Sequence, residues 1–293
     1  MILRRNFLTH TATALALALS MPLPVLADAA EPLSVTVSLR PMQAMVEQIG
    51  GPYVEATVMV PPNVHPRTFE PSPMQMAALE SSDIYIAMGI PHERNWLPQV
   101  QAARPDMPVL NFIEHVQTRT ITGRSDANAG NEIPDPHIWM GPDQLRTMAS
   151  VLRDALISLE PEHTDTFAAN TDVWLARLDA VDADAKTRLA AYEGRSFLVY
   201  HPAFGYLGDA YGLRQMAIEE QGMEPGPHRI AATIEAAQDQ GIGTIFVQGG
   251  YSEDEAQTIA AEIGAEVIKL DTLPTELIEN LTHMTTLIAA SFK

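Results

Sequence analysis

Short runs of apolar residues alternate with longer stretches in which apolar residues recur every three or four positions. The short runs in the first part of the chain have the length and the β-branched content of strands. The longer stretches have the spacing of helices that bury one face. This pattern predicts strands at 34–39, 53–60, 83–88 and 108–112, and helices at 41–51 and 72–82. Strands that alternate with helices predict parallel βαβ units.

The middle of the chain has a helical pattern. One helix is predicted from Pro142 to about Leu159, and a second from Pro161 to about Ala191, with no glycine or proline after Pro161. About thirty residues at about 1.5 Å each give a rod about 45 Å long. The rod is either an ordinary surface helix or a spine that joins two lobes.

After the long helix the alternation of strands and helices resumes. A helix is predicted at 252–264, where Ser252 and Glu255 have the spacing of a capping box. The predicted fold class is therefore α/β, with two doubly wound lobes of parallel strands flanked by helices and one long helix between them. The predicted strands of the second lobe are 196–200, 214–218, 244–248 and 266–270.

The first 29 residues have the features of a secretory signal peptide. A basic start is followed by an apolar stretch too short to span a bilayer, and small residues then allow cleavage after Ala27 or Ala29. The RRNFL segment also resembles a twin-arginine export signal, so both Sec and twin-arginine export stay open. No later stretch is long and apolar enough to span a membrane, and the mature protein is expected to be exported and soluble.

Composition narrows the function classes. The 293 residues include 37 Asp and Glu against 18 Lys and Arg, a balance that argues against nucleic acid or an anionic membrane as the partner. Cysteine is absent, so thiolate metal sites, cysteine nucleophiles and a lipid anchor on a lipobox cysteine are excluded. A metal ion would have to be held by nitrogen and oxygen. The polar segment Gln117–Pro136 predicts a long exposed loop.

Four potential metal ligands lie where predicted strands or loops end. His201 and Asp271 follow strands, on the side of a parallel sheet where ligands bind. His65 and His137 lie in loops, and all three histidines have a proline neighbour. Three imidazoles and a carboxylate suit Zn²⁺, while Mn²⁺ stays possible with the same ligands.

Several motifs around these residues occur in the order known from one family: NVHPRTFEPSP, DPHIWMGP, YHPAFGYLGDAYGL, EEQGMEPGP and EVIKLDTL. With them the chain resembles the solute-binding proteins of zinc and manganese ABC uptake systems, the ZnuA/TroA-like group, over essentially the whole mature chain. The resemblance implies a rigid connecting helix, a metal ion in the cleft between the lobes, and the ligands His65, His137, His201 and Asp271. Histidine at the third position favours zinc, because manganese-binding members commonly have glutamate there.

The resemblance also implies a function. It is that of a periplasmic protein, expected to be a monomer, that captures Zn²⁺ and delivers it to an ABC permease in the inner membrane, with no catalysis. The implied organisation is a signal peptide at 1–29, an N-terminal lobe at 30–160, the long helix at 161–191 and a C-terminal lobe at 192–293. The chain departs from many zinc-binding members in two places: no histidine lies in 117–136, and Val64 precedes the first histidine where some have glutamate.

Two alternatives remain open. One is a binding protein for manganese or for divalent cations in general, in the same transport role. The other is a zinc hydrolase, which would need an open coordination position and a general base; no HExxH motif supplies them, although Glu70 and Glu220 are possible bases. Asp135 is interpreted as a supporting or turn residue. The other histidines are left outside the predicted site: His10, His92, His115, His163, His228 and His283.

Overall fold

A computed structural model describes residues 31–61, 64, 69–121, 134–219, 225–251 and 253–292. The segment Pro32–Lys293 forms one compact unit, separate from Met1–Glu31. The predicted signal peptide, Ser252 of the predicted capping box and most of the predicted loop Gln117–Pro136 lie outside the described residues. No helix among the described residues combines the length and the hydrophobicity needed to cross a membrane.

The first sheet contains the four strands expected from the N-terminal apolar runs. All its pairs are parallel, in the order β2-β1-β3-β4, with Val35 of β1 level with Ala56 and Ile84 on its two neighbours. The strands are β1 Leu33–Val37, β2 Val54–Val58, β3 Ile84–Ala87 and β4 Val109–Asn111. Helices α1 Arg40–Gly50, α2 Pro73–Glu80 and α3 Leu97–Ala103 accompany them. The capping box of Ser72 and Gln75 at the start of α2 is present.

The second sheet repeats this topology. Its strands are also parallel, and their order is β6-β5-β7-β8. The two-lobe α/β fold is therefore confirmed. The strands are β5 Ser196–Val199, β6 Arg214–Ala217, β7 Thr244–Gln248 and β8 Glu266–Leu270, and the helices are α6 Gly205–Ala210, α7 Pro227–Asp239, α8 Glu253–Ile263 and α9 Leu277–Ser291.

Two helices connect the sheets. Helix α4 spans Pro142–Leu159, and α5 spans Thr164–Leu189, whose 26 residues give a length of about 39 Å. Helix α5 begins after Pro161–His163, because these residues form a short 3-10 turn. Further 3-10 turns span Gly51–Tyr53, Pro91–Asn95, Phe112–Glu114, Ile138–Met140 and Ala190–Tyr192.

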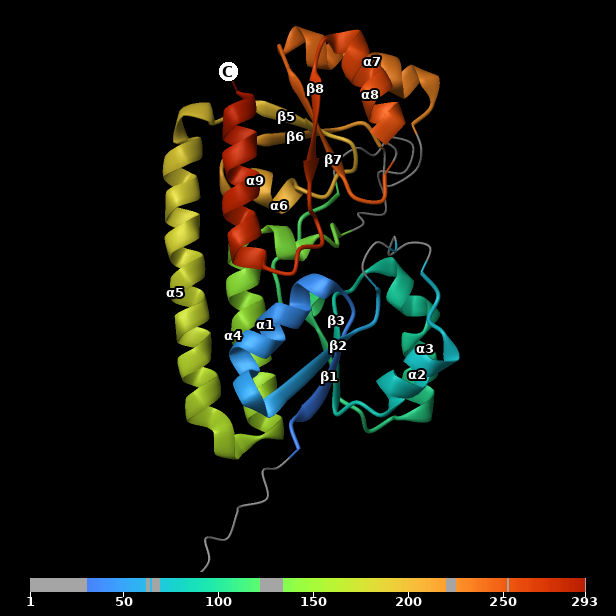
Figure 1. Ribbon diagram of the computed structural model, residues 1–293, viewed down its shortest axis with the longest axis vertical. Helices are drawn as coiled ribbons and strands as arrows, with labels where there is room; N and C mark the ends of the chain where they lie inside the picture. The colour runs from blue at the N-terminus through green and yellow to red at the C-terminus, as the bar shows by residue number, and fades with distance from the viewer. Residues whose placement is uncertain are drawn as a thin grey trace, which may run out of the picture. The chain divides into compact units, whose positions relative to one another are not determined.

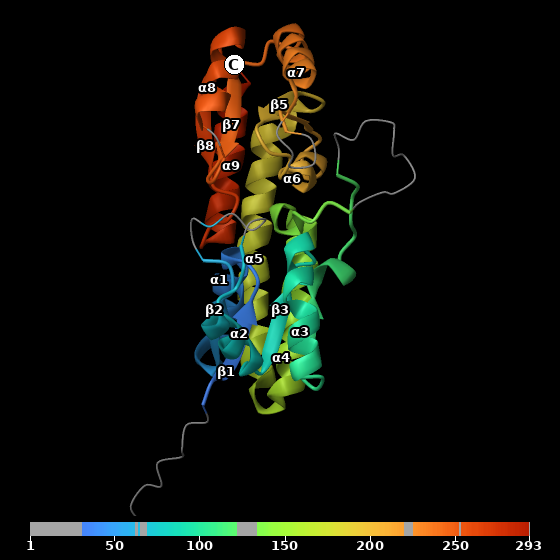
Figure 2. The same ribbon diagram turned by 90° about the vertical axis from the view of Figure 1, so that its right-hand side faces the viewer.

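Helix α5 packs against elements that accompany both sheets. It contacts α1 and α4 along one part of its length and α9 along another, as Figures 1 and 2 show. Apolar residues at helical spacing form the buried face of α5, and among them Val181 is only partly buried. The buried members of the stripe are Phe167, Trp174, Leu178 and Leu189.

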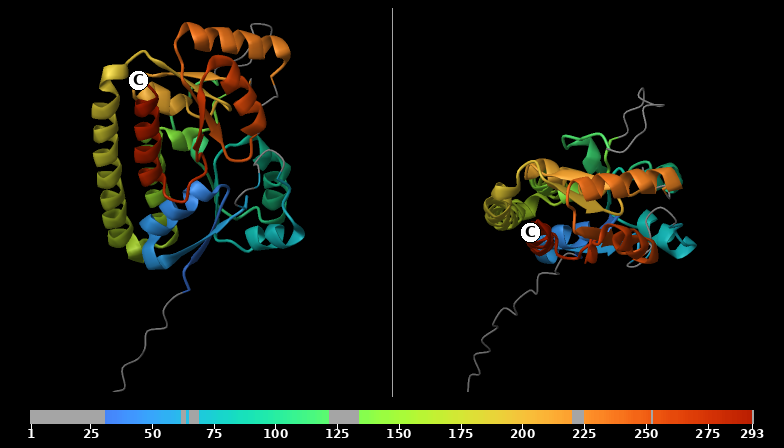
Figure 3. Two further views of the ribbon diagram at one scale, coloured as in Figure 1. Left: turned by 45° about the horizontal axis from the view of Figure 1, so that its top comes forward. Right: turned by 90° about the horizontal axis from the view of Figure 1, so that it is seen from above.

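One hydrophobic core runs through both halves of the unit. Side chains of β1 and β3 join a cluster that continues through α4, α5 and α9 to Phe197 and Val199 of β5 and Phe246 of β7. The opposite face of the second sheet has a separate cluster, which α7 and α8 cover on the side away from α5 (Figure 3). Because close-packed apolar surfaces resist sliding, the shared core favours small relative shifts of the lobes over wide opening.

A buried ion pair joins α4 to α5. The Asp182 side chain is 3 % exposed and accepts bonds from Arg146 Nη2 at 2.6 Å and from Lys186 Nζ at 2.9 Å. Burial alone would raise the pKa of the Asp182 carboxyl, but the hydrogen bonds and charges of Arg146 and Lys186 outweigh burial and lower this pKa. Ionised Asp182 therefore stabilises the folded protein.

We expect Asp182→Asn to lower the free energy of unfolding by about 2 kcal/mol at pH 7, because Arg146 loses a charged partner. The pKa of Asp182 is lower in the folded protein than in the unfolded chain. The stabilisation by ionised Asp182 is therefore fully present above the unfolded-state pKa of about 3.9, and it is lost as pH falls through the folded-state pKa. The difference between wild type and variant should thus shrink below about pH 4. Urea unfolding between pH 3 and 7 measures it, with Asp184→Asn, an exposed partner of Arg188, as the control. A difference that stays constant over this range would contradict the assignment.

Candidate metal site

His201 lies directly beyond β5, at the carboxyl edge of the second sheet. Gln248, the last residue of the neighbouring strand β7, holds its backbone on both sides. The His201 amide donates to Gln248 Oε1 at 3.2 Å, and Gln248 Nε2 donates to the His201 carbonyl at 2.7 Å. The ring of His201 is buried and stacks on Tyr251 with 4.8 Å between centroids. Backbone and ring are therefore both fixed.

His137 lies immediately before the turn Ile138–Met140 that leads into α4. Asp135 holds it through one carboxylate oxygen, which accepts from the His137 amide at 3.1 Å and from Nδ1 at 2.7 Å. Trp139, whose ring centroid is 5.5 Å from that of His137, donates from Nε1 to the Thr272 carbonyl at 2.7 Å. Asp135 thus supports His137, as its position in the sequence predicts.

The two imidazoles face each other through their Nε2 atoms, which are 3.2 Å apart. At the far side of each ring, Nδ1 meets a buried carboxylate: Asp135 at 2.7 Å from His137, and Glu219 at 2.6 Å from His201. An ionised carboxylate only accepts hydrogen bonds, so each Nδ1 carries the hydrogen. When both rings are neutral, neither Nε2 atom carries a hydrogen, and the pair can hold a proton or a metal cation between them.

The separation of the Nε2 atoms fits one small ion. Two nitrogens about 2.05 Å from Zn²⁺ at the tetrahedral angle are about 3.3 Å apart. The observed separation of 3.2 Å is close to this value. Carboxylates behind the imidazoles also match the usual surroundings of zinc-binding histidines, where they fix the tautomer and raise the basicity of the ligand.

Asp135 is part of a larger network. Burial would raise the pKa of its carboxyl, but hydrogen bonds and charge from His137, with a hydrogen bond from Arg119, lower it. Arg119 Nη1 lies 3.1 Å from Asp135 Oδ2, and its Nε donates to Asp209 of α6 at 2.7 Å. Tyr206 of α6 donates to the Asp135 carbonyl at 2.7 Å. The support of His137 therefore extends to the C-terminal half of the chain.

Gly205 makes room for this network at the start of α6. A Cβ atom at this position would lie 1.7 Å from Arg119 Nη1 and 2.9 Å from Asp135 Oδ2. Because Arg119 is bonded to both Asp135 and Asp209, its guanidinium has little freedom to move aside. Glycine is thus required here for space.

The other two predicted ligands, His65 and Asp271, are not part of this facing pair. His65 lies outside the described residues. The side chain of Asp271 is 54 % exposed, with Oδ2 3.2 Å from Arg40 Nη2 and Oδ1 accepting from the Leu273 amide at 2.8 Å. Within the described residues, the only group of three or more potential metal ligands whose ligand atoms all lie within 4.8 Å of one another is Glu160, Glu162 and His163. The Asp271 carboxylate therefore does not lie within this distance of both facing imidazoles.

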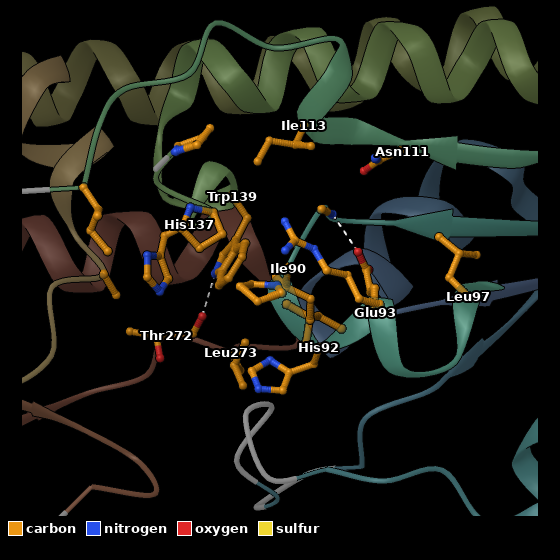
Figure 4. Close-up of a pocket in the computed structure, with 18 of the residues that line it drawn as sticks. Ile90, His92, Glu93, Leu97, Asn111, Ile113, His137, Trp139, Thr272 and Leu273 are labelled. Carbon is orange, nitrogen blue, oxygen red and sulfur yellow. Dashed lines mark hydrogen bonds between the residues drawn. The ribbon is translucent and has the colours of Figure 1, made fainter. Parts of the chain in front are cut away.

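A cavity of about 570 Å³ opens beside the two histidines. Figure 4 shows His137, Trp139 and Thr272 on its wall together with His92 and Glu93. The buried Glu93 carboxylate accepts from the Met88 and Gly89 amides at 2.8 Å each and so shapes the loop after β3, and burial raises its pKa. The cavity is far larger than one ion and leaves room for the ion to enter.

Two further residues belong to this region. His92, which the sequence suggests as a residue that could line the cleft but not as a ligand, does line the cavity. Glu219, which holds His201, follows the predicted strand 214–218 directly, so the same rule of ligand-binding residues beyond strand ends would have found it. His115, His163, His228 and His283 are not among the residues that line the cavity.

Comparison with known proteins agrees with this geometry. The model of the family described as zinc-uptake complex component A, periplasmic (ZnuA), matches residues 35–290. The high-affinity zinc uptake system protein ZnuA of Bacillus subtilis (strain 168) is 23% identical over 82% of this chain and 78% of its own length.

Two solved structures support the same relationship. The structure of a zinc-bound ZnuA deletion mutant superposes with a TM-score of 0.82 at 32% identity, over 89% of this chain and 98% of the other. A further ZnuA crystal structure gives a TM-score of 0.82 at 31% identity, over 89% and 99% of the two chains.

We expect Gly205→Ala to lower the free energy of unfolding by about 1–3 kcal/mol, because the new methyl group overpacks the space that Arg119 fills. Gly243→Ala is the matched control: nothing lies within 4 Å of a Cβ built there, so the change should be neutral or slightly stabilising. Urea unfolding followed by circular dichroism compares the two variants. Equal stability of both variants would show that Gly205 is not needed for space.

Proposed function

The chain belongs to the family of periplasmic zinc-uptake complex components A, and from this premise we propose that it captures Zn²⁺ for an ABC uptake system and delivers it to the membrane permease. The single observation that carries the proposal is the facing pair of His137 and His201, whose Nε2 atoms are 3.2 Å apart and whose Nδ1 atoms are both bonded to carboxylates. Two Nε2 atoms this close need a shared proton or a metal cation between them, and a carboxylate behind each ring matches the usual surroundings of zinc-binding histidines.

The ligand set in this proposal is His65, His137, His201 and Asp271. Imidazole nitrogens suit zinc, whereas manganese prefers oxygen ligands, so the two facing histidines favour Zn²⁺ as the cargo. Four protein ligands would close the coordination shell and leave no position for a substrate. We therefore propose a binding protein without catalysis, in preference to a hydrolase.

The proposed organisation follows from the same premise. A signal peptide at 1–29 would direct export, and lobes at 30–160 and 192–293 would be joined by the helix at 161–191. His65 and His137 would come from the first lobe, and His201 and Asp271 from the second, so that the ion ties the lobes together. Because the lobes share one core, capture needs only small movements. Release would require the permease to favour a geometry with fewer ligands, and the protein would act as a monomer.

We expect His201→Ala to lower the affinity for Zn²⁺ at pH 7 by about a hundredfold or more, because one nitrogen ligand is lost. His283→Ala removes an exposed histidine on α9 and should leave the affinity unchanged. Competition titrations of metal-free protein against a zinc chelator, repeated with Mn²⁺, measure both variants. Equal zinc affinity of wild type and His201→Ala would refute the proposed site, and tighter binding of Mn²⁺ than of Zn²⁺ would refute zinc as the cargo.

A further inference from the structure

The segment after β8 is held by side chains from the N-terminal half of the chain. Trp139 donates to the Thr272 carbonyl at 2.7 Å. Arg40, the first residue of α1, donates from Nε to the Leu273 carbonyl at 2.7 Å, and its Nη2 bonds to the same oxygen. Thr272 and Leu273 also line the cavity beside His137 (Figure 4). Trp139 and Arg40 therefore hold the two residues that follow Asp271, and with them the position of Asp271.

The same Arg40 guanidinium reaches the Asp271 carboxylate. Nη2 lies 3.2 Å from Asp271 Oδ2, so one cation contacts both a carboxylate and the carbonyl two residues later. The bonds to the Leu273 carbonyl do not depend on Asp271. The guanidinium would consequently stay in place if the Asp271 side chain turned away from it.

In this structure the Asp271 carboxylate is thus paired with the Arg40 guanidinium and not with a metal ion. The Leu273 amide occupies its second oxygen, and its carboxylate is not grouped with the two facing imidazoles. The Asp271 side chain is about half exposed, which leaves it free to change rotamer. To join the imidazoles around an ion, the carboxylate has to exchange Arg40 for that ion.

We propose that Arg40 sets the zinc affinity of the site by competing with the bound ion for the Asp271 carboxylate. This inference rests on the proposed function. In the metal-free protein Arg40 neutralises Asp271 and keeps the segment 271–273 in place. When Zn²⁺ binds, Asp271 leaves Arg40 for the ion, so the lost ion pair is subtracted from the affinity and favours release. Exposure of both side chains to water limits the size of this effect.

The expected effect is a gain in affinity when the charge is removed. Arg40→Met keeps much of the aliphatic side chain without the charge, and Zn²⁺ should bind it about tenfold more tightly than wild type. Arg40→Lys keeps the charge and should stay within about threefold of wild type. Arg177→Met is the matched control, because Arg177 pairs with Glu279 at the surface and its substitution removes the same charge from another place. The zinc affinity of Arg177→Met should equal that of wild type.

A double variant that combines Asp271→Asn with Arg40→Met tests whether Asp271 is the group for which Arg40 competes. Asp271→Asn should weaken Zn²⁺ binding, and Arg40→Met added to it should give no further gain. Competition titrations with Zn²⁺ and a chelator measure wild type and the five variants, with circular dichroism as the test of folding. A gain of the same size in both backgrounds would mean that Arg40 acts on the ion without Asp271. A folded Arg40→Met with unchanged or weaker zinc binding would overturn the proposal and mean that Arg40 only positions the segment.

Failure of the proposed function would look different. Wild-type protein would then show no tight Zn²⁺ binding at all, whatever residue stands at position 40. If Arg40→Met does not fold, the zinc-loaded wild-type crystal structure decides. The proposal requires Arg40 Nη2 and Asp271 Oδ2 to lie beyond hydrogen-bond distance, about 3.5 Å, with Asp271 on the ion. Retention of the Arg40 contact in the loaded protein would overturn it.

Discussion

The arrangement of His137 and His201 is the constraint on which the rest of the molecule depends. Each ring is tied through Nδ1 to a buried carboxylate, so neither can turn its Nε2 lone pair away from the other without losing that bond. Two lone pairs 3.2 Å apart repel each other until a cation lies between them. Folding therefore maintains the two nitrogens at the spacing of zinc ligands, and little reorganisation remains when the ion arrives.

The two rings come from distant parts of the chain, and several contacts keep them in register. His201 is fixed by its neighbour strand through Gln248, and His137 by Asp135, Arg119 and the α6 residues Tyr206 and Asp209. Behind both lies a core that α5 shares with the two lobes. A loosely hinged pair of lobes would let the rings separate, and the lone-pair repulsion would then be relieved by opening. The continuous core resists this opening and keeps the two rings close together.

Much of the fold could be predicted from the sequence, because it is encoded locally. The eight strands follow from apolar runs, and α4 follows from its helical period with the bounds that the structure shows. The shared strand order of the two sheets could not be predicted, because no sequence repeat accompanies it. Helices α3 and α6 were missed for a different reason: each is short, and proline or glycine marks its start.

The site was predictable to a lesser degree. The rule that functional residues follow strand ends located His201, and Asp135 could be inferred to support His137 because it precedes that residue by two positions. The partners that come from elsewhere in the chain carry no such local signal. Arg40 is separated from Asp271 by 231 positions, and Arg119 from Asp209 by 90, so only the tertiary structure reveals these pairs. The assignment of Asp271 and His65 as ligands stays a prediction.

The most direct test of the account is an anomalous difference map, recorded at the zinc absorption edge, of crystals of the zinc-loaded full-length protein. The account predicts the strongest peak between His137 and His201, about 2.0–2.1 Å from the Nε2 atom of each ring. Absence of a peak between the two rings, with zinc bound instead at an exposed cluster such as Glu160, Glu162 and His163, would contradict it.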